Sequence, residues 1–259
     1  MQRRIGLVTI ETLGAATPKF TAPMLLIPGM WCSAAVWRRF MGYLAHRGWT
    51  CHAVALRGHA DAVWAGSVGS VTFDDYRADV AGVVAECDAA PIVIGHDLGG
   101  LLALHCTTAA AVVALAPLVP ARAPHPVLAR LRTRLAARLA RPLRPPRGAL
   151  RLACFGREVP GGATLESARA ARQAVVLAPA EIPRRNGPTL LVAGDGDLLS
   201  PAAEIERLAQ QLGAVCHRVA AGHAMPWESG WEQRVAETHR WLIQTLGEPL
   251  LALTEGDDA

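Results

Sequence analysis

The sequence predicts an α/β fold, in which a mostly parallel, doubly wound sheet carries a helical insertion. Short apolar runs alternate along the chain with longer segments of helical periodicity, which is typical of parallel βαβ units. The apolar runs contain few polar residues, as expected for strands that helices cover on both faces. At 259 residues and 51% hydrophobic content, the chain can fill the core of one such domain.

The strands and helices are expected in a regular order. Strands are predicted at residues 5–12, 24–27, 51–56, 91–94, 112–116, 189–193 and 215–219. Helices are predicted at residues 34–46, 72–87, 98–108, 201–212 and 231–246. Pro201 suits the first position of its helix, and Ser200 before it suits the N-cap.

Residues 118–186, called the insertion below, break this order. The segment opens with a cluster of prolines, and between it and a second proline cluster Val127, Leu128, Leu131, Leu135 and Leu139 recur at helical spacing. We therefore expect residues 1–117 and 187–259 to form the α/β core, with residues 118–186 as an arginine-rich helical cap over the sheet.

The charge of the chain is unevenly placed. The insertion holds 14 arginines against three acids, or +11, which leaves −7 for the rest of a chain of net charge +4. The arginine-rich helix expected around residues 127–141, called the basic helix below, has three possible roles. It is a solvated face, it attracts an anionic or carrier-protein-bound substrate, or it contacts an anionic membrane. Nucleic acid is not an expected partner, because few aromatic residues accompany the arginines and no binding motif is present.

The composition also bears on compartment and cofactors. No apolar run free of charge and proline is long enough to span a membrane, and no secretion signal is recognisable at the N-terminus. The six cysteines include no C-x-x-C pair and are interpreted as reduced thiols. A cytoplasmic protein without a cofactor or a metal ion is therefore expected.

The most informative motif is Gly95-His96-Asp97-Leu98-Gly99, which follows an apolar run and opens a helix. Its spacing is that of the G-x-S-x-G nucleophile elbow, with Asp in place of Ser. Glycines are needed there because the turn is so sharp that side chains beside it would collide. The turn would present Asp97 above the strand ends and next to a helix N-terminus, whose amides stabilise developing negative charge.

With four further motifs in order, the chain resembles the α/β-hydrolase family over nearly its whole length. Leu25-Leu26-Ile27-Pro28-Gly29-Met30-Trp31 resembles the strand and oxyanion loop, and Leu56-Arg57-Gly58-His59-Ala60 resembles the Arg-Gly-His-Gly turn. The segments 192–201 and 221–228 resemble the loops that carry the catalytic acid and the catalytic histidine. The order nucleophile, acid, histidine is that of the family.

The resemblance implies a catalytic triad and its surroundings. Asp97 would be the nucleophile, His223 the base and Asp197 the acid that orients His223. Asp197 is preferred to Asp195 because it precedes Ser200 by three residues, as in the family pattern. The backbone amides of Met30 and Leu98 would form the oxyanion site, and Trp31 and Trp227 would contact a small-molecule substrate. His59 and His96 are interpreted as structural residues of their turns.

An aspartate at the nucleophile position resembles epoxide hydrolases and haloalkane or haloacid dehalogenases. Attack of a carboxylate on an sp³ carbon yields an ordinary ester, whereas attack on an acyl carbon would yield an anhydride with no gain. His223 would then activate the water that hydrolyses this alkyl ester.

Three departures from those enzymes keep other hypotheses open. The chain has only two tyrosines, Tyr43 and Tyr76, and neither lies in the insertion, where epoxide hydrolases use two to protonate the epoxide oxygen. Leu98 occupies the position of the halide-binding Trp or the Arg of some dehalogenases; Trp31, His125, Trp227 or an insertion arginine could substitute. The alternatives are a tailoring enzyme of secondary metabolism that uses Asp97 and His223 in non-covalent acid–base chemistry, and a ligand-binding protein without activity.

Overall fold

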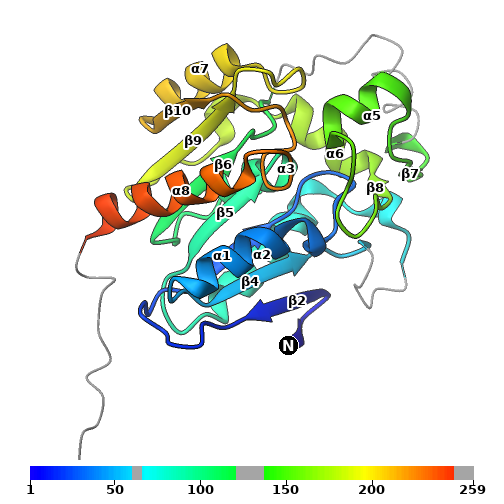
Figure 1. Cartoon of the computed structure of the whole chain (residues 1–259). Coiled ribbons are helices and arrows are strands. Elements are labelled where there is room, and N and C mark those ends of the chain that lie inside the picture. Colours follow the sequence, from blue (N-terminus) through cyan, green and yellow to red (C-terminus); the bar gives the residue numbers. More distant parts are fainter. Residues whose placement is uncertain (60–65, 121–136, 248–259) are drawn as a thin grey trace, which may run out of the picture.

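A computed structural model describes residues 1–59, 66–120 and 137–247, and it confirms the α/β fold (Figure 1). Its sheet has eight strands in the order β1-β2-β4-β3-β5-β6-β9-β10. They span Gln2–Ile5 (β1), Val8–Leu13 (β2), Met24–Ile27 (β3), Cys51–Ala55 (β4), Ile92–His96 (β5), Ala111–Leu115 (β6), Thr189–Gly194 (β9) and Val215–Val219 (β10). From β4 to β10 all neighbouring strands run parallel.

The prediction of one strand over residues 5–12 was wrong, since this stretch contributes to a hairpin. Ile5 of β1 pairs with Val8 of β2, and Gly6 between them has a φ of 54°. Glycine takes up this left-handed conformation without the steric cost that a Cβ would add. β2 then pairs antiparallel with β4, which makes the hairpin the antiparallel edge of the sheet.

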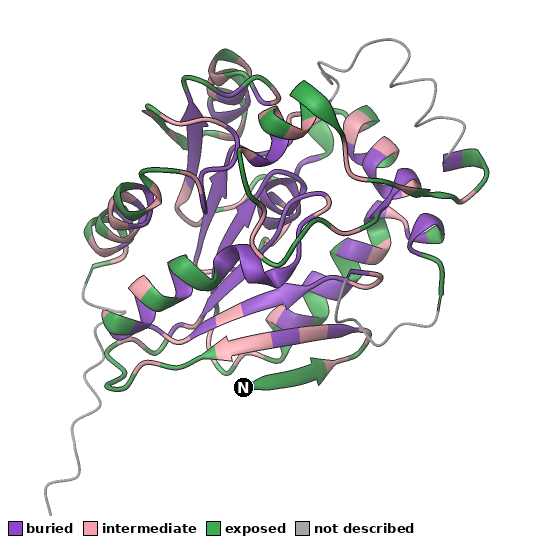
Figure 2. Ribbon diagram, turned by 45° about the vertical axis from the view of Figure 1, so that its right-hand side comes forward, coloured by how far each residue is buried: buried purple, intermediate pink, exposed green. Residues whose placement is uncertain are grey.

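Helices cover both faces of the sheet, as Figure 1 shows. On one face lie α1 (Arg38–His46) and α8 (Trp231–Leu246); on the other lie α2 (Phe73–Ala85), α3 (Leu98–Leu104) and α7 (Ala202–Leu212). Because successive strand residues point to opposite faces, Leu25 belongs to one core cluster and Leu26 to the other. The central strands β3, β4, β5, β6 and β9 are almost wholly buried, whereas β1 and β10 at the edges of the sheet are not (Figure 2).

Four of the five predicted helices have different boundaries in the structure, and α2 is shorter than predicted by one residue at its start and two at its end. Residues 34–46 divide into a 3-10 turn, Ala34–Trp37 (η1), and α1, while α3 ends at Leu104 instead of residue 108. Pro201 is itself the N-cap of α7, so Ser200 is not the cap. The amide of Ser200 instead donates to a carboxylate oxygen of Asp197 at 2.9 Å.

The described part of the insertion packs onto the core. It comprises β7 (Pro142–Leu143), α5 (Gly148–Phe155), β8 (Glu166–Ser167), α6 (Ala168–Val176) and η3 (Pro179–Glu181), of which β7 and β8 pair. Ala170, Ala171 and Ala174 of α6 are buried in the same core cluster as α2. The basic helix expected around residues 127–141 falls mostly outside the described residues. No helix of the described segments has the length and apolar character needed to cross a bilayer.

Candidate active site

The turn between β5 and α3 places Asp97 above the sheet in a strained conformation. Asp97 has φ 51° and ψ −119°, values that a non-glycine residue rarely adopts. A Cβ at Gly95 would collide with the backbone of Gly99, and one at Gly99 would collide with the carbonyl of Ile27. The two glycines therefore let the backbone close this turn, as the sequence predicted.

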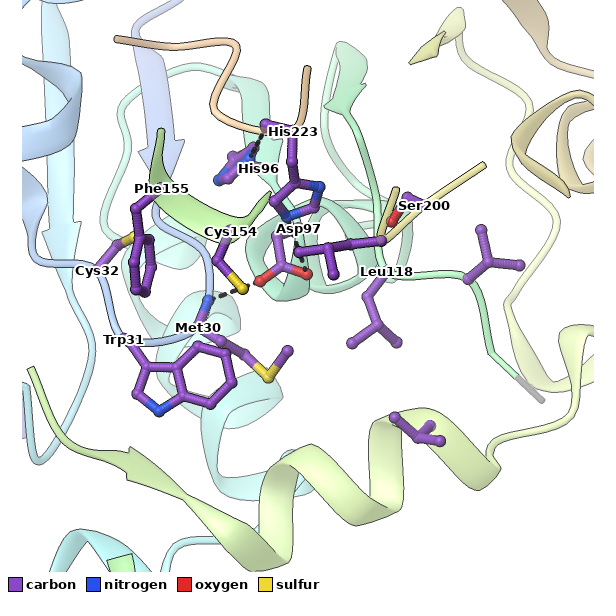
Figure 3. Close-up of a pocket in the computed structure, with 13 residues that line it drawn as sticks. Met30, Trp31, Cys32, His96, Asp97, Leu118, Cys154, Phe155, Ser200 and His223 are labelled. Carbon is purple, nitrogen blue, oxygen red and sulfur yellow. Dashed lines mark hydrogen bonds and ion pairs between the residues drawn. The ribbon is translucent and has the colours of Figure 1, made fainter. Parts of the chain in front are cut away.

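Two loops at the carboxyl end of the sheet bring the other two residues of the predicted triad to Asp97. Asp197 follows β9 and His223 follows β10, and the Nδ1–H of His223 donates to Oδ2 of Asp197 at 2.8 Å. The other ring nitrogen, Nε2, lies 3.9 Å from Oδ1 of Asp97. All three side chains are buried, and Figure 3 shows His223 directly over Asp97.

The second oxygen of Asp97 accepts one of the two backbone amides that the sequence predicted for an oxyanion site. The loop of residues 28–32, called the oxyanion loop, follows β3 and brings the amide of Met30 to 2.9 Å from Oδ2 of Asp97. The two carboxylate oxygens thus have different surroundings: Oδ2 accepts a backbone hydrogen bond, and Oδ1 faces the imidazole.

The pKa values of the triad follow from burial and mutual charge. Burial raises the pKa of Asp97, although His223 and the amides of Met30 and Leu98 favour its charged form. Burial by itself would lower the pKa of His223, but the charge of Asp197 and the hydrogen bond to it raise the pKa overall. The pKa of Asp197 is lowered, because His223 and the amides of Ser200 and Leu199 outweigh burial. The resulting arrangement favours a charged orienting acid beside a basic imidazole.

Neighbouring groups hold these loops in place. The Nε2–H of His96 donates to the backbone carbonyl of His223 at 2.7 Å, and burial lowers the pKa of His96 to about 3, which keeps its ring neutral. Glu228 accepts the amide of Gly222 at 2.7 Å, just before His223. His96 therefore has the structural role that the sequence suggested.

A small cavity of about 40 Å³ opens beside Asp97 and His223 (Figure 3). Most of its lining is apolar, with polar groups gathered at the triad end. The lining residues are Met30, Trp31, Cys32, His96, Asp97, Leu118, Val119, Cys154, Phe155, Val175, Leu199, Ser200 and His223. Cys154 and Phe155 come from α5 and Val175 from α6, so the insertion supplies one wall.

The remaining predicted site residues have different positions. Trp31 lines the cavity, but Trp227 is not among the lining residues. Trp227 packs against His96, with ring centroids 5.3 Å apart, and its indole donates to the carbonyl of Phe155. Asp195 pairs with Arg218 at the exposed surface. Tyr43 lies against the guanidinium of Arg47, away from the cavity lining, and His125 falls outside the described residues.

Sequence reasoning missed one buried group beside the site. Glu166, counted only among the acids of the insertion, is fully buried and contacts His59 and Tyr76. No local pattern signals it, because its partners lie 107 and 90 residues away along the chain.

Comparisons with solved structures show the same architecture in hydrolases of low sequence identity. A monoacylglycerol lipase from Paleococcus ferrophilus superposes with a TM-score of 0.77 at 19% identity, over 92% of this chain and 99% of that one. An esterase from Thermogutta terrifontis gives 0.66 at 19% identity, over 93% and 95%. The enol-lactonase of Burkholderia xenovorans gives 0.68 at 18% identity, over 95% and 99%.

The sequence comparisons give the family. A search of curated proteins found no match. Residues 24–238 match the model of the alpha/beta hydrolase family, a span that runs from β3 to α8 and includes the oxyanion loop, Asp97, Asp197 and His223. Family membership supports a hydrolytic activity. The chain belongs to the α/β hydrolase family.

Proposed function

We propose that this protein is a hydrolase that forms a covalent alkyl ester on Asp97 and hydrolyses it with water activated by His223. The observation that carries the proposal is that the two oxygens of the Asp97 carboxylate have different neighbours. Asp97 lines the cavity; its Oδ2 accepts the amide of Met30 at 2.9 Å, while its Oδ1 lies 3.9 Å from Nε2 of His223. At 3.9 Å the imidazole does not hydrogen-bond the nucleophile, and a carboxylate does not need it to.

In the first step, Oδ1 of Asp97 attacks an sp³ carbon of the substrate. The new C–O bond forms as the bond to the leaving group breaks, and the electron pair leaves with that group. The substrate class is an epoxide, in which the leaving oxygen stays attached and takes up a proton from water, or a carbon that bears a stable anionic leaving group such as a halide. The apolar lining suits a small organic molecule.

In the second step, a water molecule attacks the carbonyl carbon of the Asp97 ester. His223 accepts the proton of this water, and Asp197 stabilises the imidazolium that forms. The carbonyl oxygen, formerly Oδ2, becomes negatively charged beside the amide of Met30. Collapse of this intermediate releases the alcohol product and regenerates the carboxylate.

Isotope incorporation tests the ester directly. Repeated turnovers in ¹⁸O-labelled water with a panel of small epoxides and haloalkanes should place label in the Asp97 carboxylate, detected by mass spectrometry of the peptide. A His223→Gln variant should accumulate the alkyl ester, because hydrolysis then lacks its base. Turnover that leaves Asp97 unlabelled would rule out the ester mechanism.

A second candidate is non-covalent acid–base catalysis by Asp97, as in an elimination or lactone reaction of a biosynthetic tailoring enzyme. The raised pKa of the buried Asp97 carboxyl favours this candidate, because it makes the group a better proton acceptor. In that case Asp97→Asn abolishes turnover while neither the native protein nor His223→Gln carries an adduct or label.

A further inference from the structure

A fully buried carboxylate lies directly behind the oxyanion loop. Glu166, the first residue of β8, has no exposed surface and accepts from several donors. Its Oε1 accepts the hydroxyl of Tyr76 at 2.9 Å and the amide of Ser167 at 2.6 Å. Its Oε2 accepts the amide of Trp31 at 3.3 Å, and Nε2 of His59 lies 3.4 Å from the carboxylate. An ionised carboxylate, which accepts at both oxygens, suits this number of neighbouring donors.

Charge compensation keeps this group ionised in the interior. Burial by itself would raise the pKa of Glu166, but the charge of His59 and the hydrogen bonds lower it overall. Burial would likewise lower the pKa of His59, and Glu166 reverses that shift. The two side chains therefore form a buried ion pair, in which removal of one partner leaves the other uncompensated.

The contacts of this pair converge on the residues that follow the oxyanion donor. The amide of Trp31, next in sequence to Met30, donates to Glu166, and the carbonyl of Trp31 accepts the amide of Thr164 at 2.8 Å. Nδ1 of His59 lies 3.0 Å from the carbonyl of Cys32, which it can donate to. Trp31 itself has a φ of 59°, a conformation that persists only where surrounding contacts fix it.

We propose that Glu166, paired with His59, is a positioning residue that holds the oxyanion loop so that the amide of Met30 points at Asp97. The inference rests on the proposed function and extends it: the insertion takes part in catalysis through the loop as well as lining the cavity. Glu166 does not touch the reacting atoms, because its hydrogen bond to the oxyanion loop is at the amide of Trp31, one residue beyond Met30.

The two chemical steps respond differently to a displaced Met30 amide. During attack on the substrate, the Asp97 carboxylate loses its negative charge, so the amide does not favour this step. During hydrolysis the ester oxygen gains negative charge, and the amide stabilises the transition state. A misplaced loop should therefore slow hydrolysis selectively and make the alkyl ester accumulate.

The test compares Glu166→Gln with Glu181→Gln, the same substitution at an exposed acid of the insertion that caps Ala178. In Glu166→Gln, the new side-chain amide would place its NH₂ group against one of the donors from which Glu166 now accepts. Single-turnover kinetics should show hydrolysis slowed by about tenfold or more in Glu166→Gln, given that direct loss of an oxyanion donor costs roughly 10²–10³-fold. Ester formation should stay within about twofold of the native rate, because the Met30 amide does not favour that step. Glu181→Gln should match the native protein in both steps.

Hydrogen–deuterium exchange of the peptide that carries Met30 and Trp31 gives a second readout without substrate. Exchange should be faster in Glu166→Gln and unchanged in Glu181→Gln. If Glu166→Gln does not fold, Glu166→Asp serves instead, because it keeps the charge beside His59 but draws the oxygens away from Trp31.

The outcomes separate the positioning role from the proposed function. Ester accumulation together with faster exchange supports the positioning role. Equal slowing of both steps, or native exchange at Trp31 in a folded variant, overturns it. If no protein, His223→Gln included, ever carries an ester, the proposed function fails, and exchange at Trp31 then decides the positioning role by itself.

Discussion

At the scale of single residues, the proposed chemistry depends on Asp97, which has a strained backbone conformation. Its positive φ would be costly in isolation, and the packing of the β5–α3 turn holds it in place. The motif Gly95-x-Asp97-x-Gly99 predicted this geometry from the sequence because the steric requirement is local. The approach of Met30 and His223 to Asp97 was expected only through the family resemblance, since both residues are far from Asp97 in sequence.

The pH dependence of turnover should reflect the environment of His223. The ring must be neutral to accept a proton from water, and its pKa is raised above 6.5, mainly by the charge of Asp197 acting against burial. Activity should therefore fall as the pH decreases through this raised pKa, with a midpoint above the ordinary histidine range. A pH–rate profile of kcat with any substrate that turns over measures this midpoint.

Replacing Asp197 with Asn provides the matching test. Burial then dominates, so the pKa of His223 falls and the acid limb of the profile moves to lower pH. The plateau rate should drop on the order of 10⁴-fold, as it does when the aspartate of a Ser-His-Asp triad becomes asparagine. A profile whose midpoint does not move would contradict the role of Asp197.

At the scale of single elements, the sequence predicted a boundary correctly where the residues that end the element lie next to it in the chain. The strand β10 and the helix α8 have the predicted boundaries, because each apolar pattern ends at clear turn residues. The strand expected at 5–12 was wrong because an apolar run does not reveal a two-residue turn within it. The predicted start of α7 was wrong by one residue. The amide of Ser200 donates to Asp197, and Pro201 is the N-cap instead of the first helical residue.

The helix α2 has a reciprocal cap that can be tested. The hydroxyl of Thr72 accepts the amide of Asp75 at 3.0 Å, and the carboxylate of Asp75 accepts the amide of Thr72 at 2.8 Å. Thr72→Ala should lower the free energy of unfolding by about 1 kcal/mol. Urea titration at neutral pH measures this change. Ser67→Ala is the control: Ser67 precedes the 3-10 turn Val68–Ser70 (η2) without a side-chain cap, so its loss should be close to neutral.

The same cap should weaken in acid. Hydrogen bonds from the backbone and side chain of Thr72 lower the pKa of Asp75. Its contribution is therefore present above the unfolded pKa near 3.8 and is lost as the pH falls through the lower folded value. The difference in stability between Thr72→Ala and the native protein should accordingly narrow as the pH falls below that range, because the bond from the Thr72 hydroxyl to the carboxylate is lost. It should not close, because the hydroxyl still accepts the amide of Asp75.

At the scale of the whole molecule, the described part of the insertion and the core form one packed body. α6 buries its alanines in the core cluster that also contains α2, and the hydroxyl of Ser167 contacts the carbonyl of Val71. The excess of arginine in the insertion, by contrast, does not predict how the insertion packs against the core. Whether the basic insertion also attracts an anionic or carrier-bound substrate stays a hypothesis of the sequence.

Shared packing predicts cooperative unfolding of insertion and core. Ala170→Val adds two methyl groups at a fully buried position of α6 and should lower the free energy of unfolding by about 1–3 kcal/mol. Near-ultraviolet circular dichroism and residual activity should lose their signals in one coincident transition. Ala81→Val, on the exposed face of α2, controls for the helix propensity of valine. Two separate transitions would show that the insertion unfolds independently.

The sequence by itself determined the alternation of strands and helices, the turn that carries Asp97 and the order of the triad residues, because each depends on short-range patterns or on motifs. Only the tertiary structure decided which oxygen of Asp97 faces His223, that Trp227 stands behind the cavity, and that Glu166 lies beneath the oxyanion loop. These features depend on contacts between segments far apart in the chain, where burial and charge compensation leave no local trace in the sequence.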